Sequence, residues 1–200
     1  MPVRPSAKTT ALVAVDTALR PTGFVRRGHV WHQERGGGVR GWLCLSTAGS
    51  PAALDVTPLV GVCFTRFDTV SRALGVPPAP LLSLPLGYLM PEKPCWRWTF
   101  GRDGHEAAAQ SLVSTLVKHG QPFVDRLAKW DAVVKEVLGS EPLLGFDRPR
   151  KLAIIHAVNG EVGKAGEVLD KERERIADSK DAYARAFRVF VHRFGLMFLR

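Results

Sequence analysis

The sequence is short of cysteine, and its few cysteines form no group that predicts a metal site or a disulfide framework. Cys44, Cys63 and Cys95 are far apart in 200 residues and lack the short paired spacings of a zinc knuckle. Free cysteines of this kind are usually buried thiols, which suits a reducing compartment. The first fifteen residues also lack the long apolar core of a secretion signal. We therefore predict a cytoplasmic protein.

Catalytic and cofactor motifs are also lacking. Gly163 and Lys164 would suit a phosphate-binding loop, but Ala165 follows where that loop needs Ser or Thr. His105 begins a pattern like that of the zinc proteases, but Ala109 occupies the position of the second ligand. No Gly-x-Ser-x-Gly elbow marks a nucleophile. The sequence therefore predicts no catalytic, cofactor-binding or metal-binding residue.

Three-dimensional triads leave little trace in a sequence, so an unrecognised hydrolase or transferase stays open as an alternative. Such an enzyme would need a pocket that joins His29 or His32 to an acid such as Asp55 or Asp68. The two histidines are three residues apart on an expected strand, where they point to opposite faces. They would therefore not bind one metal ion together.

Acidic residues are outnumbered, with 19 Asp and Glu against 28 Lys and Arg, which gives a net charge of +9. Such a charge attracts nucleic acid, an anionic membrane or an acidic protein, and it does not determine the fold. Between 73 and 91 charged residues are absent over the length of a membrane span. Five prolines in that segment are incompatible with a spanning helix, so we predict a covered loop and no membrane span.

The first half of the chain predicts one helix followed by antiparallel strands. Leu12, Val15 and Leu19 form one helical stripe, which Pro21 ends. Runs rich in β-branched and aromatic residues follow at 24–32 and 39–45, and the three glycines 36–38 between them are typical of a hairpin turn. The run 59–67 is expected to be a central strand. The segment 95–100 is expected to be a fourth, with Trp96 and Trp98 on one face.

The second half predicts about five helices. Their expected limits are a capping box at Asp103 and Glu106 with an end at Gly120, a helix from Pro122 to Gly139, one from Asp147 to Gly160, one holding Val162 to Ile176, and a last one from Asp181. A helix, then strands, then consecutive helices predict an α+β fold with an antiparallel sheet of three to four strands. We expect an α+β domain over 1–145 and a helical extension packed on it over 146–200, or one domain over 1–200.

Several stretches resemble the bacterial DUF4304 family, a family of unknown function. The resemblance lies in a helix that leads into Gly23, Phe24, Arg26, Arg27 and Gly28, and in a later helix start at Gly120, Pro122 and Phe123. It covers roughly residues 8–140 and departs from the family pattern at 76–91. The resemblance implies a half-buried sheet followed by helices, and it brings no active site.

Our leading hypothesis is a non-catalytic protein of bacterial type that binds another, acidic protein, as an immunity or accessory component of a toxin or defence system. Apolar, uncharged residues often mark such interfaces. The candidates here are Leu81, Leu82, Leu84, Leu86, Tyr88, Leu89 and Met90.

The alternative is a nucleic-acid-binding module in which a basic aromatic hairpin contacts phosphates and bases. Its candidate contacts, which would serve an acidic protein equally well, are Arg26, Arg27, His29, Trp31, His32, Arg35 and Arg40.

Overall fold

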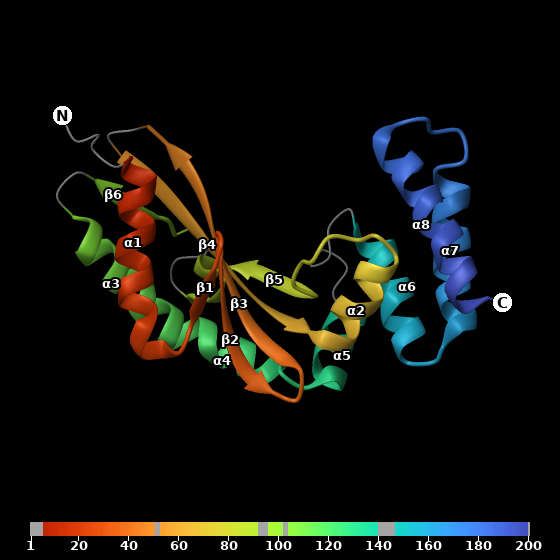
Figure 1. The fold of residues 1–200 in the computed structure, drawn as a ribbon, viewed down its shortest axis with the longest axis horizontal. Helices are drawn as coiled ribbons and strands as arrows, with labels where there is room; N and C mark the ends of the chain where they lie inside the picture. Colours follow the sequence, from red (N-terminus) through yellow and green to blue (C-terminus); the bar gives the residue numbers. More distant parts are fainter. Residues whose placement is uncertain (1–5, 51–52, 92–95, 102–103, 140–146, 200) are drawn as a thin grey trace. The chain divides into compact units, whose positions relative to one another are not determined.

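A computed structural model describes residues 6–50, 53–91, 96–101, 104–139 and 147–199. It confirms the α+β class, with an N-terminal helix, a sheet and a helical C-terminal half (Figure 1). Contacts group the chain into two compact units, which are residues 1–62 with 83–132 and residues 63–82 with 133–200. The expected boundary at residue 145 concerns domains that fold independently, and it stays a prediction.

The first unit holds the sheet and the helices that cover it. Its elements are α1 (Ala7–Leu19), η1 (Arg20–Thr22), β1 (Val25–Arg27), β2 (Val30–Gly36), β3 (Val39–Gly49), most of β4 (Ala53–Phe64), β5 (Leu82–Pro85), η2 (Leu86–Leu89), β6 (Trp98–Gly101), α3 (His105–Thr115), η3 (Leu116–Gly120) and α4 (Gln121–Leu127). Helix α1 ends close to Pro21, as the sequence predicts: its last residue is Leu19, and Pro21 lies in the 3-10 turn η1. Ser6 caps its first turn.

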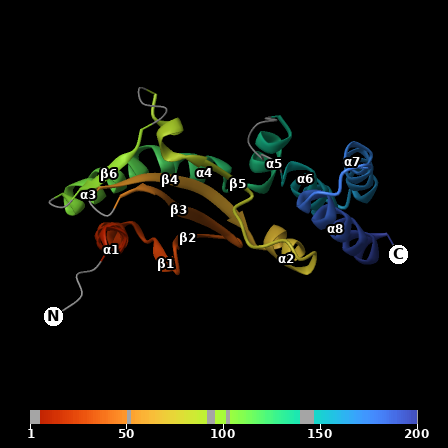
Figure 2. The same ribbon diagram turned by 90° about the horizontal axis from the view of Figure 1, so that it is seen from above.

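The strands form one six-stranded sheet. The order is β1-β2-β3-β4-β5, and β6 also pairs with β4. Figure 2 shows β2, β3 and β4 side by side. The pairs β1–β2, β2–β3 and β4–β6 are antiparallel. The predicted glycine turn is confirmed, because Gly36, Gly37 and Gly38 all have positive φ.

The sheet has more strands than the three to four expected. The run 24–32 divides at Gly28, whose φ of +68° forms a tight turn between β1 and β2. The short strand β5 lies in the proline-rich segment, where the sequence predicted only a loop. The fourth strand begins at Trp98, and Trp96 precedes it with 42% of its surface exposed.

Gly120 does not end a helix, contrary to the sequence prediction. Helix α3 continues through the π-helical turn η3 into α4, and Gly120 keeps a right-handed helical φ of −76°. A Cβ atom at this position would lie 2.6 Å from Leu116 Cδ1 and 3.2 Å from Leu86 Cδ1. The residue is therefore a glycine because the helix packs closely there. The expected helix from Pro122 to Gly139 is also divided, since α4 ends at Leu127 and α5 (Trp130–Gly139) begins three residues later.

The second unit is helical. It holds the end of β4, α2 (Thr65–Ala73), most of α5, α6 (Arg148–Val158), α7 (Val162–Arg175) and α8 (Ala182–Phe198). The last three helices confirm their predicted limits: Gly160 has a φ of +78° after α6, and the Asp181 side chain caps α8 by accepting from the Ala184 amide. The prediction of one strand over 59–67 is wrong beyond Phe64, because the chain turns there into α2.

Aromatic rings and a few buried charges fill the interior of the second unit. Phe187, Phe190 and Phe194 stack along α8, and the guanidinium of Arg150 lies over the first two rings at 5.9 and 5.8 Å. Lys151 Nζ donates to the carbonyl oxygens of Pro80 and Leu81 at 3.1 Å each. These bonds hold the proline-rich segment against α6.

No helix in the described part of the chain is both long and apolar enough to cross a lipid bilayer. The segment 73–91 instead contains the end of α2, the strand β5 and the turn η2. The capping box expected at Asp103 and Glu106 cannot be followed in full, because Asp103 lies outside the described residues.

Candidate functional site

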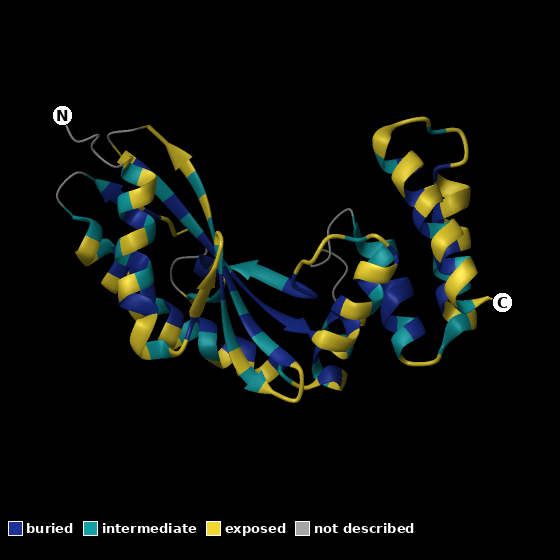
Figure 3. Ribbon diagram, viewed as in Figure 1, coloured by how far each residue is buried: buried dark blue, intermediate teal, exposed yellow. Residues whose placement is uncertain are grey.

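The two faces of the sheet have different surroundings. Side chains alternate between faces along a strand, and residues paired across neighbouring strands share a face. The register of β2 and β3 therefore places Trp31 and Leu43 on one face, and their neighbours His32 and Trp42 on the other. Buried and less buried residues alternate along the strands in Figure 3.

The helices of the first unit pack on the face that carries Trp31, which we call the core face. Trp31 is fully buried, and its Nε1 donates to Asp16 of α1 at 2.8 Å. Trp98 donates to Ser111 of α3, and Arg35 forms an ion pair with Asp125 of α4 at 3.0 Å. All three strand residues lie on the core face, and each of them contacts a different helix.

The opposite face, which we call the open face, is formed by side chains that are exposed or half-buried. Paired residues place on it Val25, Arg27, Val30, His32, Glu34, Arg40, Trp42 and Cys44. Thr99 and its partner Asp55 also point away from the helices, because Trp98, the neighbour of Thr99, contacts α3 on the core face. Val25 at the edge of the sheet exposes 63% of its surface. A half-exposed tryptophan among such residues is typical of a recognition surface.

His32 and Trp42 lie at the centre of the open face. They are direct cross-strand partners, and the next pair along the strands on this face is Val30 with Cys44. Burial lowers the pKa of His32 from its ordinary value, and the nearby charges of Arg40 and Arg27 lower it further against an opposing effect of Glu34. His32 is therefore held in its neutral form at neutral pH. Burial likewise raises the pKa of the Cys44 thiol.

Charges on the open face cancel. Arg27 and Arg40 supply two positive charges, and Glu34 and Asp55 supply two negative ones. Glu34 lies directly opposite Arg40, and Asp55 accepts a hydrogen bond from Thr99 at 2.8 Å. The centre of the face is consequently neutral and aromatic, although the whole chain has a net charge of +9.

The seven hairpin residues predicted as contacts do not form one surface. Arg26, Trp31 and Arg35 lie on the core face, and the Arg26 guanidinium stacks over the Trp31 ring at 5.5 Å. Trp31 cannot stack a base because it has no exposed surface. Arg27, His32 and Arg40 lie on the open face, and His29 is exposed in the turn beside Gly28. Strand alternation around the Gly28 turn separates the seven residues.

Trp42 is the residue whose face composition alone leaves undecided. The register places it on the open face together with Val30. A signal was present in the sequence: the turn at 36–38 and the buried positions Val39, Gly41 and Leu43 together fix the alternation of β3. Trp31 and Trp42 are both large and apolar, so hydrophobicity alone could not separate them.

The predicted interface at 81–90 is also only partly exposed. Leu81, Leu82 and Leu86 have no exposed surface, so they belong to the interior and cannot contact a partner. Leu84, Leu89 and Met90 are half-buried, and Tyr88 in η2 exposes 59% of its surface. The apolar run is used for packing, because β5 is a strand of the sheet and Leu86 of η2 packs against Gly120 of η3.

The residues proposed for a hydrolase or transferase are not brought together. His32 on β2 and Asp55 on β4 share the open face, but β3 lies between their strands. Asp68 is buried in α2, where it belongs to the second unit. A close histidine and carboxylate do occur in the second unit, where His156 Nδ1 lies 2.7 Å from Glu161 Oε2 beside Lys164. This group joins the end of α6 to the start of α7. Its hydrogen bonds and ion pairs within the described residues include no nucleophile.

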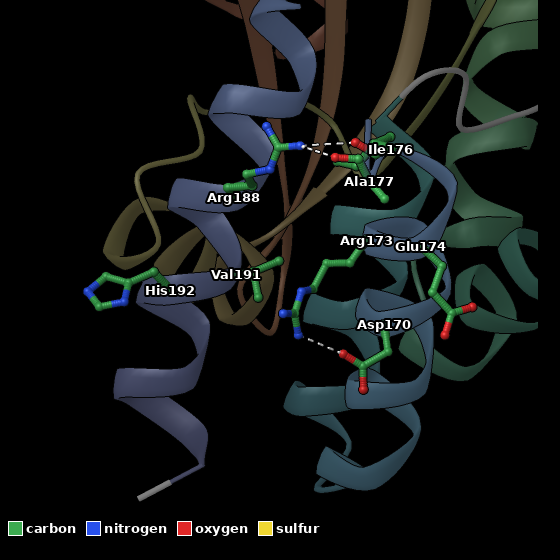
Figure 4. A pocket seen from close by; sticks show the side chains of 8 residues that line it. All are labelled: Asp170, Arg173, Glu174, Ile176, Ala177, Arg188, Val191 and His192. Carbon is green, nitrogen blue, oxygen red and sulfur yellow. Dashed lines mark hydrogen bonds and ion pairs between the residues drawn. The ribbon is translucent and has the colours of Figure 1, made fainter. Parts of the chain in front are cut away.

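Two grooves lie between helices. A cavity of about 770 Å³ separates α7 from α8, and Figure 4 shows Arg188 and Val191 pointing toward α7. Its charges are internally satisfied, since Arg173 pairs with Asp170 and Arg188 donates to carbonyl oxygens at the end of α7. A second cavity of about 850 Å³ lies between α1 and α3, lined mainly by small residues. Within the described residues, no group of three metal-ligating side chains is assembled.

Comparisons of the chain with protein-family models, with curated proteins and with solved structures give no match. The resemblance to the DUF4304 family therefore stays a prediction, and the case for a function depends on the open face.

Proposed function

We propose that the chain is a non-catalytic binding protein and that the open face of its sheet is the surface that contacts a partner protein. The observation that carries the proposal is the one-sided packing of the sheet. Helices of the first unit cover the face of Trp31, while Trp42 and His32 occupy the centre of the opposite face. Tryptophan at the centre of a surface is the residue type that most often dominates binding energy.

A protein suits this face better than a nucleic acid does. Binding to phosphates requires a surplus of unpaired positive charge along one surface. Here Glu34 and Asp55 offset Arg27 and Arg40, and Arg35 is paired with Asp125 on the core face. A neutral aromatic centre with charged residues around it is instead the pattern of protein interfaces.

The positive charge of the whole chain has a separate role in this proposal. A net charge of +9 accelerates the encounter with an acidic protein over long range, whereas the neutral centre supplies the contact. The proposal places this activity in a reducing cytoplasm, where Cys44 on the open face stays a thiol. An immunity or accessory role in a toxin or defence system is the form of binding that we propose, and an adjacent toxin gene would support it.

Quantitative capture from a lysate of the source organism tests the proposal. Wild-type chain, Trp42→Ala and Trp96→Ala serve as baits, since Trp96 is an exposed tryptophan outside the open face. We expect one protein to be recovered by wild type and Trp96→Ala and to weaken about thirtyfold with Trp42→Ala, the effect of removing a central tryptophan. Nuclease treatment of the lysate should leave this recovery unchanged. Failure to find any protein with this pattern, or a loss on nuclease treatment, would contradict the proposal.

A further inference from the structure

Helix α8 has two sides of opposite character. Its aromatic side is buried, with Phe187, Phe190 and Phe194 in the interior of the second unit. Its outer side nevertheless carries apolar residues, because Val189 exposes 52% and Leu196 exposes 47% of their surfaces. The alternation of exposed and buried residues along this helix is visible in Figure 3. A helix that needed only one buried side would have polar residues at these outer positions.

The outer side of α8 is also basic. The helix contains Arg185, Arg188, His192 and Arg193 and no acidic residue. Each arginine donates to backbone carbonyl oxygens: Arg185 to Lys180, Arg188 to the last residues of α7, and Arg193 to Leu74. A neutral carbonyl positions a guanidinium without cancelling its charge, so the positive charges stay available. Asp181, which caps the helix, is the nearby acid and lies next to Arg185 at the start of the stripe.

Basic and apolar residues interleave along one line of the helix. Arg185, Val189, Arg193 and Leu196 follow one another at intervals of four, four and three residues, so they share a face. We call these four residues the outer stripe. An amphipathic helix that presents alternating apolar and acidic residues is the complementary surface.

We propose that the outer stripe of α8 binds an acidic amphipathic helix of a partner protein. Apolar contacts at Val189 and Leu196 supply the buried area, and carboxylates opposite Arg185 and Arg193 select the partner and its direction. An anionic bilayer is the poorer fit. Membrane-surface helices insert their large aromatic side chains, whereas those of α8 face inward, and the guanidinium of Arg193 is bonded to the Leu74 carbonyl at the end of α2.

Selection from a peptide library tests this second binding surface independently of the open face. The library holds helical peptides of about 18 residues, long enough to form a helix on binding. Leucines in each peptide repeat at the spacing of the outer stripe, and Glu, Gln or Lys is allowed at the positions between them. The full chain is the target. We expect the selected peptides to be enriched in Glu and their binding to weaken as salt is raised.

Variants then assign the binding to the stripe. We expect Val189→Ser with Leu196→Ser to weaken a selected peptide at least tenfold, and Arg185→Gln with Arg193→Gln to weaken it about tenfold. Val13→Ser is the matched control, because Val13 is an equally exposed valine on α1 of the first unit. Circular dichroism verifies that each variant is folded. Peptides without a Glu excess, or peptides that bind all variants equally, would overturn the proposal.

Co-sedimentation with lipid vesicles tests whether the outer stripe binds a membrane instead of a protein. Vesicles of phosphatidylcholine with about one third phosphatidylserine carry the surface charge of an anionic leaflet. We expect no co-sedimentation with the wild-type chain. Sedimentation that the Val189→Ser and Leu196→Ser double variant abolishes would assign the stripe to membranes and refute the protein partner. Trp42→Ala changes the open face and leaves the outer stripe intact. A peptide that binds the outer stripe should therefore bind Trp42→Ala like the wild-type chain, so failure of one proposal can be distinguished from failure of the other.

Discussion

The hairpin of β2 and β3 carries two tryptophans with opposite surroundings. Trp31 is fully buried on the core face, where its indole donates to Asp16. Trp42 lies eleven positions further along the chain on the open face, paired across the strands with His32. The same residue type thus stabilises the fold on one side and remains available for contact on the other. Strand alternation, rather than hydrophobicity, assigns the two roles.

The first and largest test of this comparison is truncation of each tryptophan. Trp31→Ala should lower the free energy of unfolding by about 3–5 kcal/mol, since it creates a cavity in the core and leaves a carboxylate without its hydrogen-bond donor. Trp42→Ala should cost less, about 1–2 kcal/mol, because its side chain is only partly buried. Urea denaturation followed by far-UV circular dichroism measures both. Similar losses for the two variants would refute the assignment of faces.

A second test concerns the close packing on the core side of the first unit. Gly120→Ala should cost about 1–3 kcal/mol, because the added methyl group meets Leu116 at 2.6 Å and Leu86 at 3.2 Å. Gly166→Ala in α7 is the control, since nothing lies within 4 Å of its added methyl group. That substitution should stabilise the chain by about 0.5–1 kcal/mol through helix propensity. A neutral Gly120→Ala would show that the turn η3 relaxes freely.

Local signals in the sequence were sufficient where one residue determines the backbone. The glycines at 36–38 predicted a turn, Asp181 predicted a helix start, and the class α+β followed from the order of the segments. Gly28 and Gly120 were misinterpreted for opposite reasons. Gly28 forms a turn inside a run that looks like one strand, whereas Gly120 is required by the close approach of Leu116 and of Leu86, which is distant in sequence.

The candidate site was less predictable, because it depends on register. The seven hairpin residues were recognised, but their division between two faces follows from pairings such as Val25 with His32 and Arg26 with Trp31. The helix α2 was missed because residues 59–64 form a continuous apolar run, which the strand prediction extended across Thr65 and Arg66. Phe67, Val70 and Leu74 repeat at helical spacing, and Gly75 follows them with a φ of +78°, so the signal was present but weaker than that of the strand.

A third and smaller test compares charges on the two faces. The ion pair of Arg35 with Asp125 bridges β2 and α4 on the core face, where Arg35 exposes 22% of its side chain and Asp125 55%. Asp125→Asn should cost about 0.5–1 kcal/mol, as expected for a largely exposed pair. Arg27→Gln, at an exposed position on the open face, should change stability by less than about 0.5 kcal/mol. Chemical denaturation at low salt resolves the difference, and a larger loss for Arg27→Gln would contradict it.

The smallest effect expected is a pH dependence that originates at His32. Its pKa in the folded chain is lowered by burial and then by Arg40 and Arg27, so the unfolded chain takes up a proton first as the pH falls. Stability should therefore decrease as the pH falls below about 6.5, the ordinary value for histidine, until the folded state is protonated as well. In His32→Gln this part of the decrease should disappear, whereas His29→Gln in the exposed turn serves as the matched control. Denaturation midpoints between about pH 5 and 8 measure the slope, and an unchanged slope in His32→Gln would mean that neither burial nor the charges of Arg40 and Arg27 lower the pKa of this imidazole.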